Sequence, residues 1–270
     1  MPRPDLDHYA VVDRLRAAGC VYAEEEAALL IEAASDHRGD LDRLVSARVA
    51  GRPLEQLLGW VEFCGRRLAV GPDAFVPRVR TELLAEHGLS MITSGSMITD
   101  GAVVVELCCG VGAVSAVLLH SGRVGELYAV DIDPQALPYA RHNLVEPAMI
   151  LVGDLYDPLP ATIIGRVDLI VANAPYVPTG AIALMPREAR DHEPLVALDG
   201  GEDGAELHRR IIADARRWLR PGGQLLIETG REQSVITAGE MQAHGFETEV
   251  VVDDQRDATV VVGTSELSDS

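Results

Sequence analysis

The stretch VVVELCCGVGAVSAVLL, residues 103–119, joins a short apolar run to a glycine-rich turn and then to apolar residues at helical spacing. Val103–Leu107 is typical of a buried strand, and Ala113–Leu119 predicts a helix. Gly110 and Gly112 allow the tight turn between them. Such a turn lets a ligand approach the backbone, and a helix N-terminus favours a carboxylate or phosphate. The stretch therefore predicts the first strand and helix of a ligand-binding α/β sheet.

The same alternation continues to the end of the chain. We expect further strands at Leu127–Asp131, Met149–Val152, Asp168–Ala172, Gln224–Glu228, Glu247–Val252 and Thr259–Val262, and helices at Pro134–Leu144, Ala205–Leu219 and Gln233–His244. Short apolar strands that alternate with helices indicate a parallel sheet covered on both faces. Only Asp253–Ala258 separates the last two strands, so they should form an antiparallel hairpin. The prediction is a seven-stranded α/β sheet, unlike the usual dinucleotide-binding arrangement.

The residues before this sheet follow other patterns. Residues 7–56 carry apolar side chains at helical spacing and few strand signals. A hairpin is expected around Gly65, a helix from about Thr81, and a linker between domains at Met91–Asp100. We therefore divide the chain into an N-terminal helical domain at 1–58, a joining segment at 59–100 and the sheet domain at 101–270.

Composition narrows the class of protein. Lys plus Arg number 23 against 42 Asp plus Glu, a formal charge of −19, which argues against non-specific binding to nucleic acid or membranes and is compatible with a basic protein partner. The four cysteines form no C-x-x-C pair, so no zinc site is predicted, and no His cluster has metal-ligand spacing. The N-terminal residues are too polar for a signal peptide. These features predict a cytoplasmic protein without a membrane segment.

Acidic residues at three successive strand ends indicate the ligand. Glu106 ends the first strand, Asp131 ends the second, and Asp154 follows the third. Asp131 suits the paired hydroxyls of a ribose, and Asp154 could accept from an adenine amino group with Leu155 packed on the ring. Glu106 would repel a pyrophosphate and attract an ammonium group, and the turn lacks the third glycine of dinucleotide-binding proteins. A ligand with both a ribose and an ammonium group is S-adenosylmethionine.

The fourth strand ends in VANAPYVPTG, residues 171–180. An amide nitrogen is a poor nucleophile, and an enzyme can help by holding both of its hydrogens so that the lone pair faces the methyl donor. The Asn173 side-chain oxygen and the Ala174 carbonyl are suitable acceptors. Pro175 restricts Ala174 to extended conformations, and Tyr176 offers a ring face to a planar group. This loop predicts methylation of an amide or amino nitrogen through positioning.

Together these motifs resemble the protein-(glutamine-N5) methyltransferases of the HemK/PrmC type, which methylate the glutamine of the Gly-Gly-Gln motif in peptide-chain release factors. The resemblance runs from about residue 48 to the C-terminus. AFVPRVRTELL is similar to the family's P-R-P-E-T-E motif, VELCCGVGAV to D-L-G-T-G-S-G, and NAPY to N-P-P-Y. DIDPQALPYARHN, VGDLYDPL and LRPGGQLLIETGREQ are similar to its later segments.

The resemblance implies a role for each matching position. The S-adenosylmethionine site would comprise Glu106, Cys108, Cys109, Gly110, Val111, Gly112, Asp131, Asp154, Leu155 and Asn173, closed over by Phe75 and Pro77. Asn173, Ala174, Pro175 and Tyr176 would hold the acceptor glutamine, and the N-terminal helices would contact the protein substrate. We expect a monomer. The departures, with Glu106 for aspartate, Cys108 for glycine, Ala174 for proline and Val79-Arg80 for Pro-Glu, remove no group that the chemistry needs.

Three alternatives remain at this point. The related N-P-P-Y loop also serves enzymes that methylate adenine in DNA or RNA, where a flipped base presents a similar planar amino group. Such an enzyme needs a basic channel, which the charge of −19 disfavours. A non-catalytic paralogue is supported only by the altered loop proline. A small-molecule methyltransferase is disfavoured by the N-terminal helical region.

Overall fold

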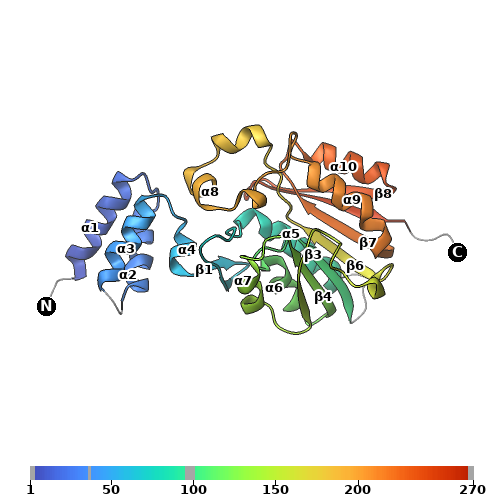
Figure 1. Cartoon of the computed structure of the whole chain (residues 1–270), viewed down its shortest axis with the longest axis horizontal. Helices are drawn as coiled ribbons and strands as arrows, with labels where there is room; N and C mark the ends of the chain where they lie inside the picture. The colour runs from blue at the N-terminus through green and yellow to red at the C-terminus, as the bar shows by residue number, and fades with distance from the viewer. Residues whose placement is uncertain (1–3, 36–37, 95–100, 267–270) are drawn as a thin grey trace.

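Four helices form the N-terminal part of the computed structural model, which describes residues 4–35, 38–94 and 101–266. They are α1 (Pro4–Ala17), α2 (Ala23–Ala33), α3 (Arg38–Val49) and the short α4 (Leu54–Leu58). The first three pack around an apolar cluster of their own that includes Leu15, Leu30 and Val45. In Figure 1 they lie at one end of the molecule, beside the sheet rather than on either of its faces. A hairpin of β1 (Trp60–Phe63) and β2 (Arg66–Ala69) follows α4.

Seven strands form the main sheet in the order β5-β4-β3-β6-β7-β9-β8. They are β3 (Ala102–Leu107), β4 (Val124–Asp131), β5 (Ala148–Val152), β6 (Val167–Ala172), β7 (Leu219–Glu228), β8 (Phe246–Asp253) and β9 (Ala258–Ser265). The pairs among β3 to β7 are parallel, whereas β9 runs antiparallel to both β7 and β8. The predicted seven-stranded sheet with its C-terminal hairpin is therefore confirmed.

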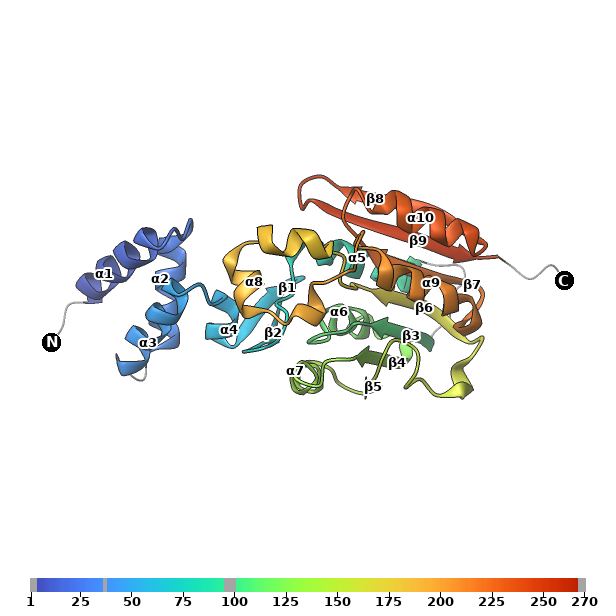
Figure 2. The same ribbon diagram turned by 45° about the horizontal axis from the view of Figure 1, so that its top comes forward.

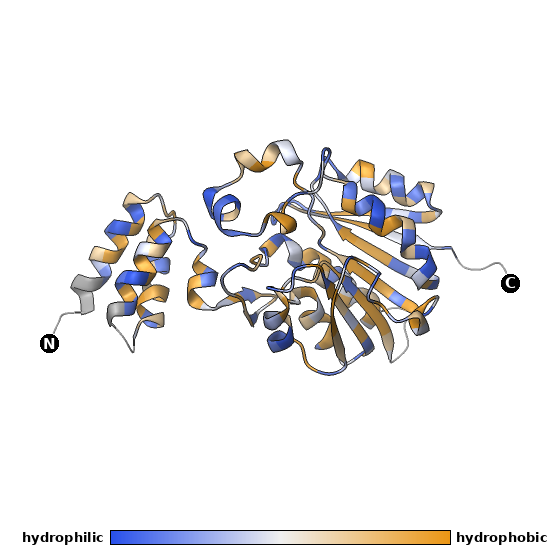
Figure 3. Cartoon of the chain, in the orientation of Figure 1, coloured by the Kyte–Doolittle hydropathy of each residue, from blue (hydrophilic) through white to orange (hydrophobic). Residues whose placement is uncertain are grey.

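Helices cover both faces of this sheet (Figure 2). One layer contains α5 (Glu82–Ser94), α6 (Ala113–Leu119) and α7 (Leu137–Asn143), and the other contains α9 (Glu206–Trp218) and α10 (Ser234–Ala243). Alternate residues of the strands face alternate layers: Val104 belongs to the same apolar cluster as Leu84 of α5, and Val105 to the same cluster as Ile211 of α9. The strands are accordingly apolar on both faces, as the colouring of Figure 3 shows.

Helix α5 changes the interpretation of the segment that precedes the sheet. The predicted linker at Met91–Asp100 is wrong for residues 91–94, which complete α5, while 95–100 lie outside the described residues. The helix continues because Leu84, Gly88 and Ile92 fall on one face that packs into the core of the sheet. The repeated Met-Ile-Thr sequence suggests a polar linker, but Ile92 is buried against the sheet and keeps residues 91–94 in the helix.

An extended segment of short elements connects β6 to α9. It contains η3 (Thr179–Leu184), α8 (Arg187–His192) and η4 (Leu195–Ala197), and two further 3-10 turns lie elsewhere, η1 (Val79–Thr81) and η2 (Ala161–Ile163). Both ribbon views place α8 on the side of the sheet that faces the N-terminal helices. None of the helices in the described ranges is long and apolar enough to cross a membrane.

Candidate active site

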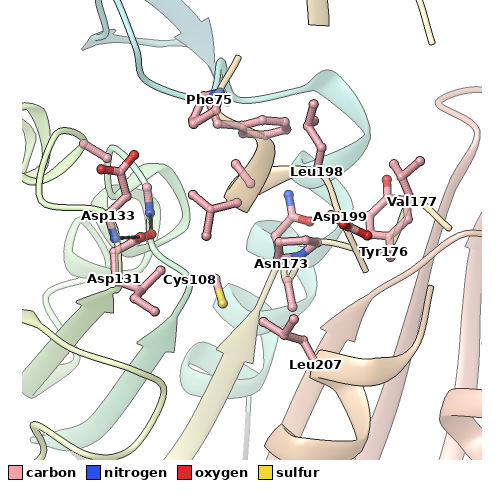
Figure 4. A pocket seen from close by; sticks show the side chains of 18 of the residues that line it. Phe75, Cys108, Asp131, Asp133, Asn173, Tyr176, Val177, Leu198, Asp199 and Leu207 are labelled. Atoms are coloured by element: carbon pink, nitrogen blue, oxygen red, sulfur yellow. Dashed lines mark hydrogen bonds between the residues drawn. The ribbon is translucent and has the colours of Figure 1, made fainter. Parts of the chain in front are cut away.

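A cavity of about 390 Å³ opens at the carboxyl ends of β3, β4, β5, β6 and β7, where ligands bind in open α/β sheets (Figure 4). Ten of the residues predicted from the sequence line it: Phe75, Cys108, Gly110, Asp131, Asp154, Leu155, Asn173, Ala174, Pro175 and Tyr176. The structure thus brings together residues from four strand ends and from the segment before α5. The segment between β6 and α9, the first turns of α9 and the end of β7 complete the lining.

The glycine-rich turn is held against the end of β4 by Asp131. One carboxylate oxygen of Asp131 accepts a hydrogen bond from the Gly110 N–H at 2.6 Å, and the other accepts from the Asp133 N–H at 2.8 Å. Burial raises the pKa of Asp131. Each oxygen can accept a further hydrogen bond, and Asp131 lines the cavity, so the carboxylate can accept from the hydroxyls of a ribose.

Backbone conformation in this turn explains its small residues. Cys108 has φ 55° and Gly112 has φ 77°, both in the left-handed region. A Cβ on Gly112 would also lie 2.9 Å from the Leu144 side chain. Cys108 adopts this conformation although it has a side chain, and it lines the cavity on the side of the strands (Figure 4). Burial raises the pKa of its thiol.

The next loop contributes Asp154 and Leu155 to the same wall. Arg210 of α9 donates to one oxygen of Asp154 at 2.8 Å, which orients the carboxylate and leaves its other oxygen available. Leu155 is buried with φ 49°, so its backbone bends sharply and places its side chain among the lining residues.

The side chains of the first and last residues of the loop Asn173–Tyr176 are each held by a hydrogen bond. Asn173 donates from Nδ2 to Oγ1 of Thr81 at 3.1 Å, which directs its Oδ1 away from Thr81. The Tyr176 hydroxyl donates to Oε1 of Glu228 at 3.3 Å. The Ala174 side of the loop is buried, and its carbonyl is restricted by Pro175. A planar amide placed beside this loop would therefore meet two acceptors in set positions.

Phe75 is held over the cavity by an ion pair. Arg78 lies over the Phe75 ring at 5.0 Å and donates to both oxygens of Glu193, at 2.7 and 2.6 Å. The Glu193 side chain is fully buried and also accepts from the Val76 N–H. These contacts join the segment before α5 to the segment after β6, and so they hold two walls of the cavity against each other.

Five predicted residues lie outside the lining. Glu106 is buried and accepts from both the N–H and the hydroxyl of Ser115 in α6, so its carboxylate faces the helix. Cys109, Val111 and Gly112 support the turn from behind, and Pro77 lies between lining residues without joining them. The attraction of Glu106 for an ammonium group would have to act from behind the turn rather than by contact.

Several lining residues escaped the sequence-based prediction: Arg78, Arg80, Asp133, Leu198, Asp199, Leu207, Arg210 and Glu228. Glu228 could have been found, because it ends β7 in the same way that Asp131 ends β4. Burial raises its pKa to about 7, an effect that the nearby Thr81 hydroxyl, Arg80 and Tyr176 partly oppose. Leu198 and Asp199 come from the segment after β6, which has no regular apolar period to place it.

Comparison with known proteins identifies the family. Residues 81–187 match the Methyltransferase small domain family. The chain is 38% identical over 211 residues to the release factor glutamine methyltransferase of Mycolicibacterium smegmatis, covering 77% of this chain and 73% of that protein. It is 37% identical over 203 residues to the enzyme of the same name from Gloeobacter violaceus, covering 73% and 68%.

Among solved structures, the ribosomal protein L11 methylase of Lactobacillus delbrueckii subsp. bulgaricus shares the fold. Its TM-score is 0.53 at 16% identity, over 73% of this chain and 84% of that one. The fold is therefore that of the Rossmann-like methyltransferases. The sequence is much more similar to the release factor glutamine methyltransferases than to this structural neighbour. The chain belongs to the release factor glutamine methyltransferase family.

Proposed function

We propose that this protein transfers a methyl group from S-adenosylmethionine to the side-chain amide nitrogen of a glutamine in a peptide-chain release factor, within its Gly-Gly-Gln motif. The observation that carries this proposal is the loop Asn173–Tyr176, which ends β6 beside a cavity bordered by the Asp131 carboxylate. The names of the curated relatives support the same substrate.

The residues of the cavity fit the cofactor. Asp131 would accept from the ribose hydroxyls, and Asp154 with Leu155 would hold the adenine. Gly110 leaves its backbone open to the ligand, with nothing within 4 Å of the position that a Cβ would take. S-adenosylmethionine, when bound, supplies an electrophilic methyl group on a sulfonium sulfur. Phe75 would cover the ligand from the opposite side of the cavity (Figure 4).

At the acceptor, this chain positions the nucleophile. Asn173 Oδ1 would accept from one amide N–H and the Ala174 carbonyl from the other, so that the nitrogen lone pair faces the methyl group. The cofactor would supply the methyl group to this nitrogen and leave as the neutral thioether, and the nitrogen would release one proton to solvent. The two acceptors would be in position before the reaction begins, and such preorganisation supplies most of the rate enhancement at sites of this kind.

The N-terminal helices, within residues 1–58, complete the proposal as the region that contacts the protein substrate. The charge of −19 suits a basic partner and disfavours the alternative of an adenine methyltransferase, as do the names of the relatives. A cytoplasmic location and a monomeric state belong to the same proposal.

The test is a methyl-transfer assay with S-adenosylmethionine and purified release factors from the same cell, read by mass spectrometry of the Gly-Gly-Gln peptide. We expect a single methyl on that glutamine.

Asn173→Ala should lower kcat by about 10²-fold with cofactor affinity nearly unchanged, because it removes one preorganised contact to the acceptor. Asp131→Ala should weaken cofactor binding first. Unmethylated glutamine alongside normal cofactor binding would refute the proposed substrate.

A further inference from the structure

Glu228 is a buried carboxylate for which the proposed reaction has no use so far. It ends β7, is 1% exposed, and lines the cavity next to the acceptor loop. Its Oε1 accepts from the Tyr176 hydroxyl, while its Oε2 has no hydrogen-bond partner among the described residues. A buried acid with an open acceptor position is costly, and such groups are retained mainly at functional sites.

Thr81 connects this carboxylate to Asn173. Its hydroxyl is buried, accepts from Asn173 Nδ2 at 3.1 Å, and therefore still has its own proton to donate. The Glu228 carboxylate is the neighbouring acceptor, because the Thr81 hydroxyl lies near enough to lower the pKa of Glu228. Oε2 of Glu228 is open to receive the Thr81 proton, since it has no partner among the described residues. Asn173 and Tyr176, the two polar side chains of the acceptor loop, thus both depend on one buried acid.

We propose that Thr81 and Glu228 are positioning residues for the methylation step, and that the ionised Glu228 carboxylate orients Asn173 through Thr81 and orients Tyr176 directly. The inference deepens the proposed function and rests on it. An amide group can rotate by half a turn at little cost in shape, so Asn173 needs a partner that identifies its nitrogen. Thr81 acts as that partner only while its own proton points to Glu228. Asn173 Oδ1 is then presented to the substrate.

Protonation of Glu228 should weaken this arrangement. A protonated carboxyl donates instead of accepting, and it would compete with Asn173 for the oxygen of Thr81. The groups that face Glu228 are Arg80 from η1 and Tyr176 from the acceptor loop, and the strand beside it contributes the apolar Val260. Burial sets the pKa of Glu228 near 7, so the change falls within the range of an ordinary assay.

The experiment measures kcat for release-factor methylation from pH 5.5 to 8.5, with cofactor affinity determined in parallel. Thr81→Val keeps the shape and removes the hydroxyl, and we expect kcat to fall about 10- to 100-fold at an unchanged cofactor Kd. Thr81→Ser restores the hydroxyl and should restore the rate. Thr229→Val is the matched control, because Thr229 is equally buried and its hydroxyl has no partner.

Glu228→Gln separates positioning from mere packing. The wild type should lose activity as the pH falls through about 7, whereas Glu228→Gln should lack this acidic limb and remain near the low-pH rate of the wild type. An unchanged limb in Glu228→Gln, or equal rates for Thr81→Val and Thr81→Ser, would overturn the inference. A wild type that binds cofactor but methylates no release factor would instead overturn the proposed function.

Discussion

Glu106 is a buried acid next to the glycine-rich turn. It is 5% exposed, and its partners are the N–H and hydroxyl of Ser115 in the first turn of α6. Burial raises its pKa to about 7, and the neighbouring Asp131 charge adds to the increase against the effect of the Ser115 hydrogen bonds. The ionised form is therefore tolerated rather than favoured, and the residue acts on the fold more directly than on a ligand.

Replacement of Glu106 by glutamine should change how stability depends on pH. Because folding raises this pKa from 4.5 to about 7, the contribution of the protonated acid is full below about pH 4.5 and is lost as the pH rises through 7. Glu106→Gln keeps an acceptor for Ser115 and avoids that loss. We expect it to be more stable than the wild type by up to about 3 kcal/mol at pH 8, and nearly equal at pH 4, below the unfolded pKa.

Denaturant unfolding at both pH values measures the difference, and other titrating groups cancel because they are common to the two proteins. A variant that is less stable than the wild type at pH 8 would show that the ionised carboxylate is needed at the helix N-terminus.

Among the elements, the segment between β6 and α9 sets the position of the acceptor loop. Its backbone hydrogen bonds join Val177 to Leu198 and Gly200 to Val177, at 3.1 and 2.9 Å. A Cβ on Gly200 would lie 2.7 Å from the Tyr176 Cα and 2.8 Å from the Pro175 carbonyl oxygen. The acceptor loop therefore packs directly against the backbone of Gly200. Because the atoms in this contact are backbone atoms, none of them can turn aside to make room for a side chain at position 200.

Gly200→Ala should push the acceptor loop out of place. We expect kcat for glutamine methylation to fall about 10²-fold, because a displacement of this size at the nucleophile removes the alignment of the reacting atoms. Cofactor affinity, measured by titration, should change little, since Asp131 and the glycine-rich turn are on other strands. Gly180→Ala is the control in the same segment, where nothing lies within 4 Å of the added Cβ. Equal losses in both variants would contradict the argument.

The elements also show what the sequence could predict and why. The strands and the helices that cover the sheet after residue 101 were predictable because each has its own period and its own boundary residues, whereas α8 was not predicted. Strand ends in a parallel sheet also meet at one edge. That reasoning placed Asp131 and Asn173 together correctly. It could not supply Thr81, whose contact with Asn173 spans 92 positions, or the orientation of Glu106, which depends on the hydroxyl of one helix residue.

At the scale of the whole molecule, a few polar contacts connect the N-terminal helices to the catalytic side. Arg48 of α3 donates to Glu26 of α2 and to Glu188 of α8, and Gln56 donates to the carbonyls of Ala74 and His192. The Arg48 side chain is 11% exposed, so its ion pairs are screened less than surface pairs. Through α8 these contacts reach the segment that carries Glu193 and the cavity wall.

Glu188→Gln should therefore loosen the N-terminal helices without unfolding them, because Arg48 keeps its pair with the buried Glu26. If the helices contact the release factor, their orientation contributes to binding of that large substrate. We expect KM for the release factor to rise about 3- to 10-fold, a loss of roughly 1 kcal/mol that is typical of one partly exposed ion pair. The cofactor Kd and the kcat at saturating release factor should remain as in the wild type.

Asp42→Asn is the control: it removes an exposed partner of Arg14 on the same helices and should leave KM unchanged. A KM that does not respond to Glu188→Gln would mean that recognition lies in the catalytic region alone, and a fall in kcat would mean that α8 acts on the acceptor loop instead.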